Sequence, residues 1–108
     1  MTVGELSKID ELQVVCMPSP DRVINGAYIG DLLSWVMGRA KEGNVWITIM
    51  SNGNTVAVAS LADVSCVILA ENVTLEESVI ETAIQNNINI FSTNLTAYDT
   101  AVMLSKFE

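Results

Sequence analysis

The sequence predicts an α/β fold in one small domain over residues 1–108, with a four-stranded, mainly parallel sheet in repeated βα units and helices on both faces. Three observations predict it. The chain has 108 residues, half of them apolar, which suffices for a single core. Short β-rich runs alternate with helical runs along the chain. The β-rich runs are continuously apolar, which is typical of parallel strands covered on both faces.

Four strands are predicted, with helical segments between them. They span residues 12–16, 45–50, 65–70 and 88–92, and we expect the first strand to lie at the centre of the sheet. A short helical segment is predicted within residues 1–11, before the first strand. All four strands are expected to end at one edge of the sheet, where ligands usually bind in this class of fold.

The first long helix follows the first strand and is amphipathic. Its predicted core face consists of Leu32, Leu33, Val36, Met37 and Ala40, and Gly43 is expected to end it. Trp35 lies off this face. It either folds back over a neighbouring loop or packs against another chain, and we favour the second interpretation.

Residues 54–63 could form either a strand or a helix, because Val and Ala alternate there. We predict a helix, since the preceding strand is already complete and the turn around Asn52 supplies a cap. Apolar residues point from this helix in nearly all directions, which a small monomer cannot bury easily. Together with Trp35, this pattern predicts a homodimer whose interface includes Trp35, Val58 and Leu61.

Two further helices complete the predicted fold. Thr74 to Glu77 has the spacing of a capping box, so a third helix should open there and end near Asn87. The last helix should begin near Thr96 or Ala97.

Composition and charge restrict the functions that fit this chain. The formal net charge is −8, which disfavours nucleic-acid and membrane partners. No apolar run is long enough to span a membrane and no signal peptide is recognised, so we expect a cytoplasmic protein. Neither a P-loop nor a dinucleotide-binding glycine motif is present, and no cofactor is predicted.

Histidine is absent and only two cysteines occur, Cys16 and Cys66. The lack of histidine removes the commonest general base and the commonest zinc ligand. Both cysteines lie in apolar runs, and we interpret them as buried thiols rather than as a disulfide or a metal pair. No catalytic or metal-binding residue is predicted.

The loop of residues 17–30 is the most distinctive segment, because it contains an Asp-Arg pair and two glycines before a helix. Arg22 either binds an anionic ligand or fixes the loop by pairing with Asp21, Asp31 or a backbone carbonyl, and we favour the fixing role. Asp31 either contacts a ligand or caps the following helix. The candidate ligand-binding residues in the loops at the expected carboxyl edge are Asp21, Arg22, Asn25, Gly26, Tyr28, Gly30, Asp31, Asn52, Asn54 and Thr93.

These motifs resemble the DRTGG domain, which is named for an Asp-Arg-Thr-Gly-Gly loop. The resemblance extends to residues 45–49, 54–59 and 88–93. Here Val23, Ile24 and Asn25 replace the threonine, and Ala27 stands in place of the second glycine. Ligand binding at the loop therefore depends on whether that position needs a positive φ angle.

The resemblance implies a non-catalytic accessory module. Such domains occur in pyrophosphatases with CBS domains and in long phosphotransacetylases, and the fold is similar to the N-terminal domain of HPr kinase, whose kinase activity requires a separate P-loop domain. We therefore expect a homodimeric regulatory or assembly module that senses a small phosphorylated or nucleotide ligand or docks to a partner protein. The alternative is a small enzyme acting on a phosphorylated metabolite, with a site at the carboxyl edge of the sheet built from Cys16, Arg22, Asp31 and the polar loop residues.

Overall fold

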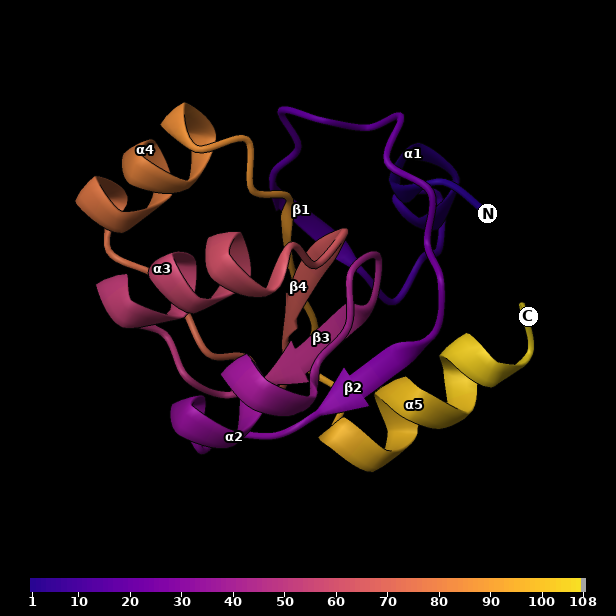
Figure 1. The fold of residues 1–108 in the computed structure, drawn as a ribbon. Helices are drawn as coiled ribbons and strands as arrows, with labels where there is room; N and C mark the ends of the chain where they lie inside the picture. The colour runs from indigo at the N-terminus through magenta and orange to yellow at the C-terminus, as the bar shows by residue number, and fades with distance from the viewer. Residues whose placement is uncertain (108) are drawn as a thin grey trace.

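The computed structural model describes residues 1–107 and contains one five-stranded mixed sheet, with strand order β1-β5-β4-β3-β2 (Figure 1). The three strands predicted from residue 45 onward are confirmed and lie parallel to one another. The fifth strand is an addition to the four that were predicted. The strands are β1 (Gln13–Cys16), β2 (Ala27–Ile29), β3 (Val45–Thr48), β4 (Cys66–Leu69) and β5 (Ile90–Ser92).

The additional strand, β2, lies inside the segment that was predicted as a loop. It pairs parallel with β3, with Ala27 opposite Val45 and Ile29 opposite Ile47. Three residues between two glycines are too short to give the apolar run by which a strand is recognised in sequence. The predicted 17–30 loop is therefore a shorter connection followed by an edge strand.

β1 differs from its prediction in both position and direction. It lies at the opposite edge of the sheet from β2 and runs antiparallel to β5, with Gln13 opposite Ser92 and Cys16 opposite Ile90. Its first residues, Gln13 and Val14, are exposed, as expected for an edge strand. Because β1 is reversed, its last residue lies beside the first residues of the other strands.

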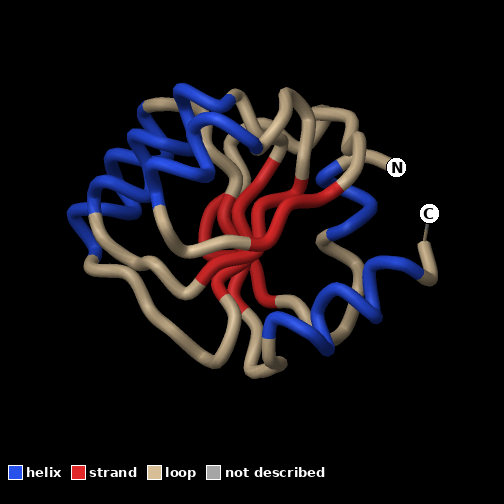
Figure 2. The backbone as a smooth tube through the Cα atoms, turned by 60° about the horizontal axis from the view of Figure 1, so that its bottom comes forward, coloured by secondary structure: helices blue, strands red, loops and turns tan. Residues whose placement is uncertain are grey.

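Five helices cover the sheet in two layers (Figure 2). One face packs against α2, α3 and α4, which contribute Val36, Val56 and Ala83 to that core. The other face packs against α1 and α5, which contribute Leu6 and Leu104. The helices are α1 (Val3–Leu6), α2 (Leu33–Arg39), α3 (Gly53–Ala62), α4 (Glu77–Gln85) and α5 (Ala97–Ser105).

Two predicted helix starts are wrong. The capping box at Thr74 does not form, because α4 begins only at Glu77 and its N-cap, Glu76, makes no side-chain cap. A capping box occurs instead at the start of α1, between Thr2 and Glu5. The N-cap of α2 is Leu32 rather than Asp31.

The helix α2 is shorter than predicted and buries only part of its expected core face. Val36 is buried, whereas Leu32 and Met37 are exposed. Seven residues form only about two turns, so few positions can reach the sheet. The helix also ends at Arg39, before Gly43, which adopts a positive φ of 83° in the following turn.

The predicted helix over 54–63 is confirmed, and Asn52 caps it by accepting a hydrogen bond from the Asn54 backbone N–H. α3 contacts both α2 and α4, which explains why it has more than one apolar side. Val58 is only 5% exposed, so its place in the predicted dimer interface is wrong: its side chain already packs inside the chain. Leu61 is 72% exposed and Trp35 is 53% exposed.

Among the helices of residues 1–107, none is long and apolar enough to cross a membrane.

Candidate functional site

The segment that joins β1 to β2 crosses the whole amino-terminal edge of the parallel strands. We call residues 17–26 the strap. Because β1 runs antiparallel to the other strands, the strap begins at this edge, and it must pass the starts of β5, β4 and β3 before it enters β2. The expectation that this segment lies at the carboxyl edge of the parallel strands is therefore wrong.

A polar side chain fixes the strap at each strand that it passes. Before β5, Asn89 accepts a hydrogen bond from the Ser19 backbone N–H at 2.9 Å and donates one to the Ser19 carbonyl oxygen at 2.8 Å. Before β4, the Ser65 hydroxyl donates to the Val23 carbonyl oxygen at 2.6 Å. Before β3, the Asn44 amide donates to the Asn25 carbonyl oxygen at 2.6 Å. The strap is thus attached to the start of every strand that it crosses.

The strap also contacts the first helix of the chain. The backbone N–H of Val3 donates to the carbonyl oxygen of Arg22 at 2.9 Å, and that of Ile24 donates to the carbonyl oxygen of Met1 at 2.8 Å. A movement of the strap would therefore displace α1 as well as the starts of the strands.

Arg22 fixes the strap to the end of α3. Its guanidinium donates one hydrogen bond to the Asp63 carboxylate and another to the Asp63 backbone carbonyl, both at 3.0 Å. This agrees with the predicted fixing role: a backbone carbonyl was among the expected partners, whereas the Asp63 carboxylate was not. Asp63 caps the end of α3 in the left-handed conformation, with φ of 55°, which turns its carbonyl and carboxylate toward the same guanidinium.

At the opposite edge, the predicted site residues hold the turns after the strands. The Asp31 carboxylate accepts hydrogen bonds from the Thr48 hydroxyl at 2.7 Å and from the Ile49 backbone N–H at 3.0 Å. The Thr93 hydroxyl donates to the Glu11 carbonyl oxygen at 2.8 Å. Asp31 therefore joins the ends of β2 and β3, and Thr93 joins the end of β5 to the start of β1.

The predicted ligand-binding residues do not form one site. Asp21, Arg22, Asn25 and Gly26 lie at the amino edge of the parallel strands, whereas Gly30, Asp31, Asn52, Asn54 and Thr93 lie at the carboxyl edge. Tyr28 lies within β2, between the two groups. Strands of this length separate the two edges by roughly 10 Å or more. The expectation that these residues share one edge is wrong, because it assumed that β1 runs parallel to the other strands.

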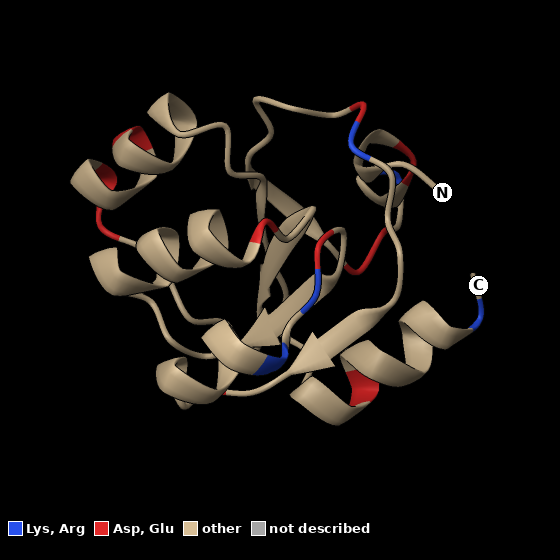
Figure 3. Ribbon diagram, in the orientation of Figure 1, with Lys and Arg blue, Asp and Glu red and all other residues tan. Residues whose placement is uncertain are grey.

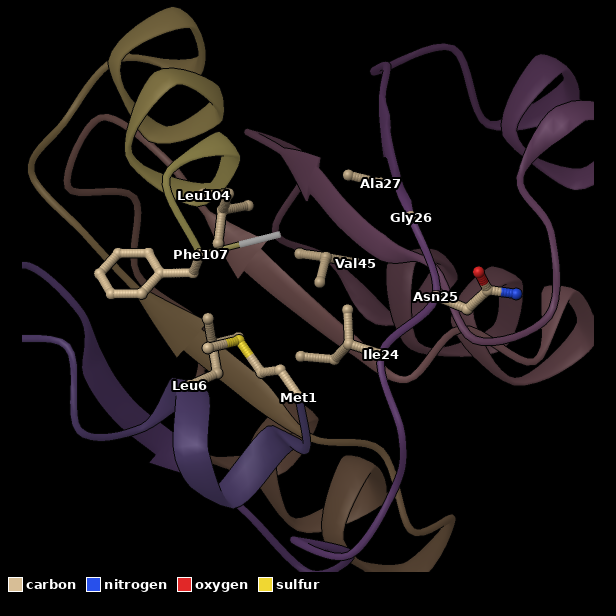
Figure 4. A pocket seen from close by; sticks show the side chains of 9 residues that line it. All are labelled: Met1, Leu6, Ile24, Asn25, Gly26, Ala27, Val45, Leu104 and Phe107. Carbon is tan, nitrogen blue, oxygen red and sulfur yellow. The ribbon is translucent and has the colours of Figure 1, made fainter.

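A cavity of about 370 Å³ lies where the strap enters β2, on the sheet face that only α1 and α5 cover (Figure 4). Side chains of the sheet, the strap, α1 and the C-terminal segment surround it, and no charged side chain lines it. The lining residues are Met1, Leu6, Ile24, Asn25, Gly26, Ala27, Val45, Leu104 and Phe107. This cavity could not be predicted from the sequence, because its walls come from four separate parts of the chain.

A second hollow, of about 550 Å³, shares Asn25 with this cavity as a lining residue. Arg22, Lys41 and Glu42 line it, together with Val23, Asn25 and Gly43. An apolar cavity and a hollow with two cationic side chains and one anionic side chain therefore adjoin at Asn25. Such a pair suits a ligand with one flat, apolar part and one anionic part.

Two glycine-motif positions behave differently at the entry to β2. Gly26 has φ of 74°, and a Cβ atom there would lie 3.2 Å from the Asn44 side-chain nitrogen. A side chain at this position would be strained. Ala27, which stands in place of the second glycine, is an ordinary strand residue paired with Val45. The backbone at this position therefore does not require glycine.

Both thiols are buried and free, as predicted. Burial raises the pKa of Cys16, and it raises the pKa of Cys66 strongly. The Cys16 thiol donates to the Ile88 carbonyl oxygen at 3.4 Å. Neither group is therefore a thiolate near neutral pH. In the described part of the chain, no three Cys, Asp or Glu side chains are grouped so that they could hold a metal ion.

Comparisons with known proteins agree with this architecture. The family model described as the DRTGG domain matches residues 14–107. A crystal structure of the CBS and DRTGG domains of the regulatory region of Clostridium perfringens pyrophosphatase, complexed with the activator diadenosine tetraphosphate, is similar in fold, with a TM-score of 0.65 and 18% identity. The similarity covers 83% of this chain and 40% of that one. A comparison with curated proteins gave no significant match.

Proposed function

Because the chain belongs to the DRTGG domain family, we propose that it is a non-catalytic, homodimeric regulatory module of the cytoplasm that senses a small ligand of the nucleotide type. The observation behind this proposal is the pair of hollows that adjoin at Asn25. The base of a nucleotide fits the apolar cavity, and its phosphate groups fit the hollow with Arg22 and Lys41.

The strap provides a means for such a ligand to alter the molecule. Ile24, Asn25 and Gly26 belong to the strap and also line the apolar cavity. The strap is hydrogen-bonded to the segment before each strand that it crosses and to the start of α1. A ligand that displaces residues 24–26 therefore acts on several elements at once. This is the behaviour required of a sensing module rather than of a rigid structural one.

The enzyme alternative receives less support. It requires Cys16, Arg22 and Asp31 to meet, but Asp31 lies at the carboxyl edge of the sheet and the other two lie at the amino edge. Burial raises the pKa of Cys16, which makes it a poor nucleophile.

The homodimer is proposed on the basis of exposed apolar side chains. Trp35 and Leu61 are more than half exposed in the described chain, and the Arg39 guanidinium lies 3.9 Å from the Trp35 ring centroid, which holds the ring in place. Fixed aromatic side chains are favourable anchors at interfaces. Sedimentation at micromolar concentration should give twice the chain mass for the wild type.

A thermal-shift experiment tests ligand sensing. We expect AMP, ATP and diadenosine tetraphosphate to raise the melting temperature, because a ligand that binds only the native state stabilises it. Adenosine, which lacks phosphate, should act more weakly. Lys41→Glu should reduce the shifts, whereas Lys8→Glu makes the same change of charge on a residue outside both hollows and should leave them unaltered. If none of these compounds shifts the melting temperature at millimolar concentration, the nucleotide proposal fails.

A further inference from the structure

One edge of the sheet leaves backbone groups without a strand partner. β2 is the last strand of the sheet and pairs only with β3. The Gly26 carbonyl oxygen accepts a hydrogen bond from the Val45 N–H, and the Gly30 N–H donates to the Ile47 carbonyl oxygen. Successive strand residues point their backbone groups to opposite sides. Ala27 and Ile29 therefore direct their N–H and C=O groups away from β3.

Although β2 is only three residues long, this edge lacks the charged residues, prolines and bulges that usually prevent strand pairing between molecules. β2 contains no charged residue and no proline, and Ala27 and Ile29 are exposed. By contrast, the register of β1 at the other edge is interrupted between Val14 and Cys16. Exposed regular edges are normally covered, shortened or charged in native proteins. An uncharged, uncovered edge therefore indicates a binding surface.

Apolar side chains follow directly after β2 and continue the same surface. Ile29 ends the strand, and Leu32 and Trp35 follow it at the start of α2, all of them about half exposed or more. α2 and α5 lie on either side of β2 (Figure 1). α5 contributes the exposed side chains of Tyr98 and Val102. The helices on both sides of β2 therefore carry exposed apolar side chains.

The distribution of charge favours a second copy of the chain as the partner. Residues 22–48 contain three of the five basic residues but only two of the 13 acidic residues. α5 and its C-cap add one acidic residue, Asp99, and one basic residue, Lys106. The acidic residues lie mostly elsewhere (Figure 3). Two molecules with a net charge of −8 repel each other over most of their surfaces. The β2 edge is where two copies can meet with least repulsion.

We propose that two copies of the chain pair through β2, antiparallel and around a two-fold axis, so that their sheets join into one. This proposal rests on the homodimer of the proposed function and specifies how it forms. An axis through the two Tyr28 residues places Ala27 of one copy opposite Ile29 of the other. Residues opposed in this way exchange both of their N–H···O=C hydrogen bonds. Leu32, Trp35 and the α5 side chains supply the additional area, because stable interfaces bury about 1,200 Å² or more.

Amide hydrogen exchange at several protein concentrations tests the pairing. The N–H groups of Ala27 and Ile29 should exchange rapidly in dilute samples and become at least tenfold more protected in concentrated ones. The Tyr28 N–H should be protected at every concentration, because it faces β3. A dimer in which the Ala27 and Ile29 amides stay unprotected would overturn the strand pairing but leave the proposed homodimer intact. A monomer at all concentrations would overturn both.

A matched pair of substitutions provides a second test. Ile29 on β2 and Ile84 on α4 are both 48% exposed. A lysine on the β2 edge opposes pairing, so Ile29→Lys should raise the dimer dissociation constant at least tenfold while leaving the circular dichroism of the monomer unchanged. Ile84→Lys should leave the dissociation constant unchanged. Equal effects of the two substitutions, or no effect of Ile29→Lys, would overturn the proposal.

Discussion

The link between Arg22 and Asp63 predicts a measurable loss of stability when the guanidinium is removed. Arg22→Ala abolishes two hydrogen bonds, one to the Asp63 carboxylate and one to its carbonyl oxygen. A typical hydrogen bond contributes about 1 kcal/mol net, and a partly exposed ion pair contributes about 0.2–1 kcal/mol more. Because both side chains are partly exposed, we expect a total loss of about 2 kcal/mol in the free energy of unfolding.

Two further variants separate the parts of this link. Arg22→Lys keeps the charge but cannot make both hydrogen bonds in the same geometry. It should therefore lower the free energy of unfolding by about half as much as Arg22→Ala does. Asp63→Asn removes the charge, but asparagine still offers an oxygen acceptor and tolerates the left-handed conformation of position 63. In the Asp63→Asn background, Arg22→Ala should therefore cost about 0.5 kcal/mol less than in the wild type.

Urea unfolding followed by circular dichroism measures these differences, since small domains usually unfold in a two-state manner with a constant m-value. Arg39→Ala provides the control. Arg39 contacts an exposed tryptophan ring, so its substitution should lower the free energy of unfolding by only about 0.5–1 kcal/mol. If Arg22→Ala costs no more than Arg39→Ala, the inference that Arg22 fixes the strap is wrong.

Three more predictions concern buried polar groups. Asp31→Ala leaves the buried Thr48 hydroxyl without its acceptor and should cost about 1–3 kcal/mol in urea unfolding, whereas Asp31→Asn should cost less. Asn89→Ala removes three hydrogen bonds of a side chain that is almost fully buried, and should lower the free energy of unfolding by about 3 kcal/mol, more than any other substitution proposed here. Because the pKa of Cys66 is raised in the folded chain, the folded chain keeps a proton that the unfolded chain loses above about pH 8.5. The free energy of unfolding should therefore fall as the pH rises beyond that value. In Cys66→Ala this fall should be shallower.

Continuous apolar runs made most of the sheet predictable. β3, β4 and β5 were found because their buried residues form unbroken runs such as Cys66–Leu69. α3 was recognised from its length and from the turn at Asn52. The direction of β1 was not predictable, because the burial of a four-residue strand is the same whichever way it runs. That single reversal moved the strap from one edge of the sheet to the other and divided the predicted site.

The partner of Arg22 could not be found from spacing. Asp63 is 41 positions away along the chain and contacts the guanidinium only because it ends α3 in a left-handed conformation. A weak signal existed: α3 ends without a glycine cap, and Asp is one of the few other residues that adopt such a conformation. The adjoining hollows at Asn25 gave no signal, since their walls depend on the packing of distant segments.

The apolar cavity lies between the two ends of the described chain, because Met1 and Phe107 both form part of its wall (Figure 4). Neighbouring ends allow a domain to be placed within a loop of a host protein without stretching either junction. In such a fusion, a molecule in the cavity would touch both points of attachment. If the proposed ligand occupies this cavity, its contacts with Met1 and Phe107 would couple binding to the geometry of both junctions.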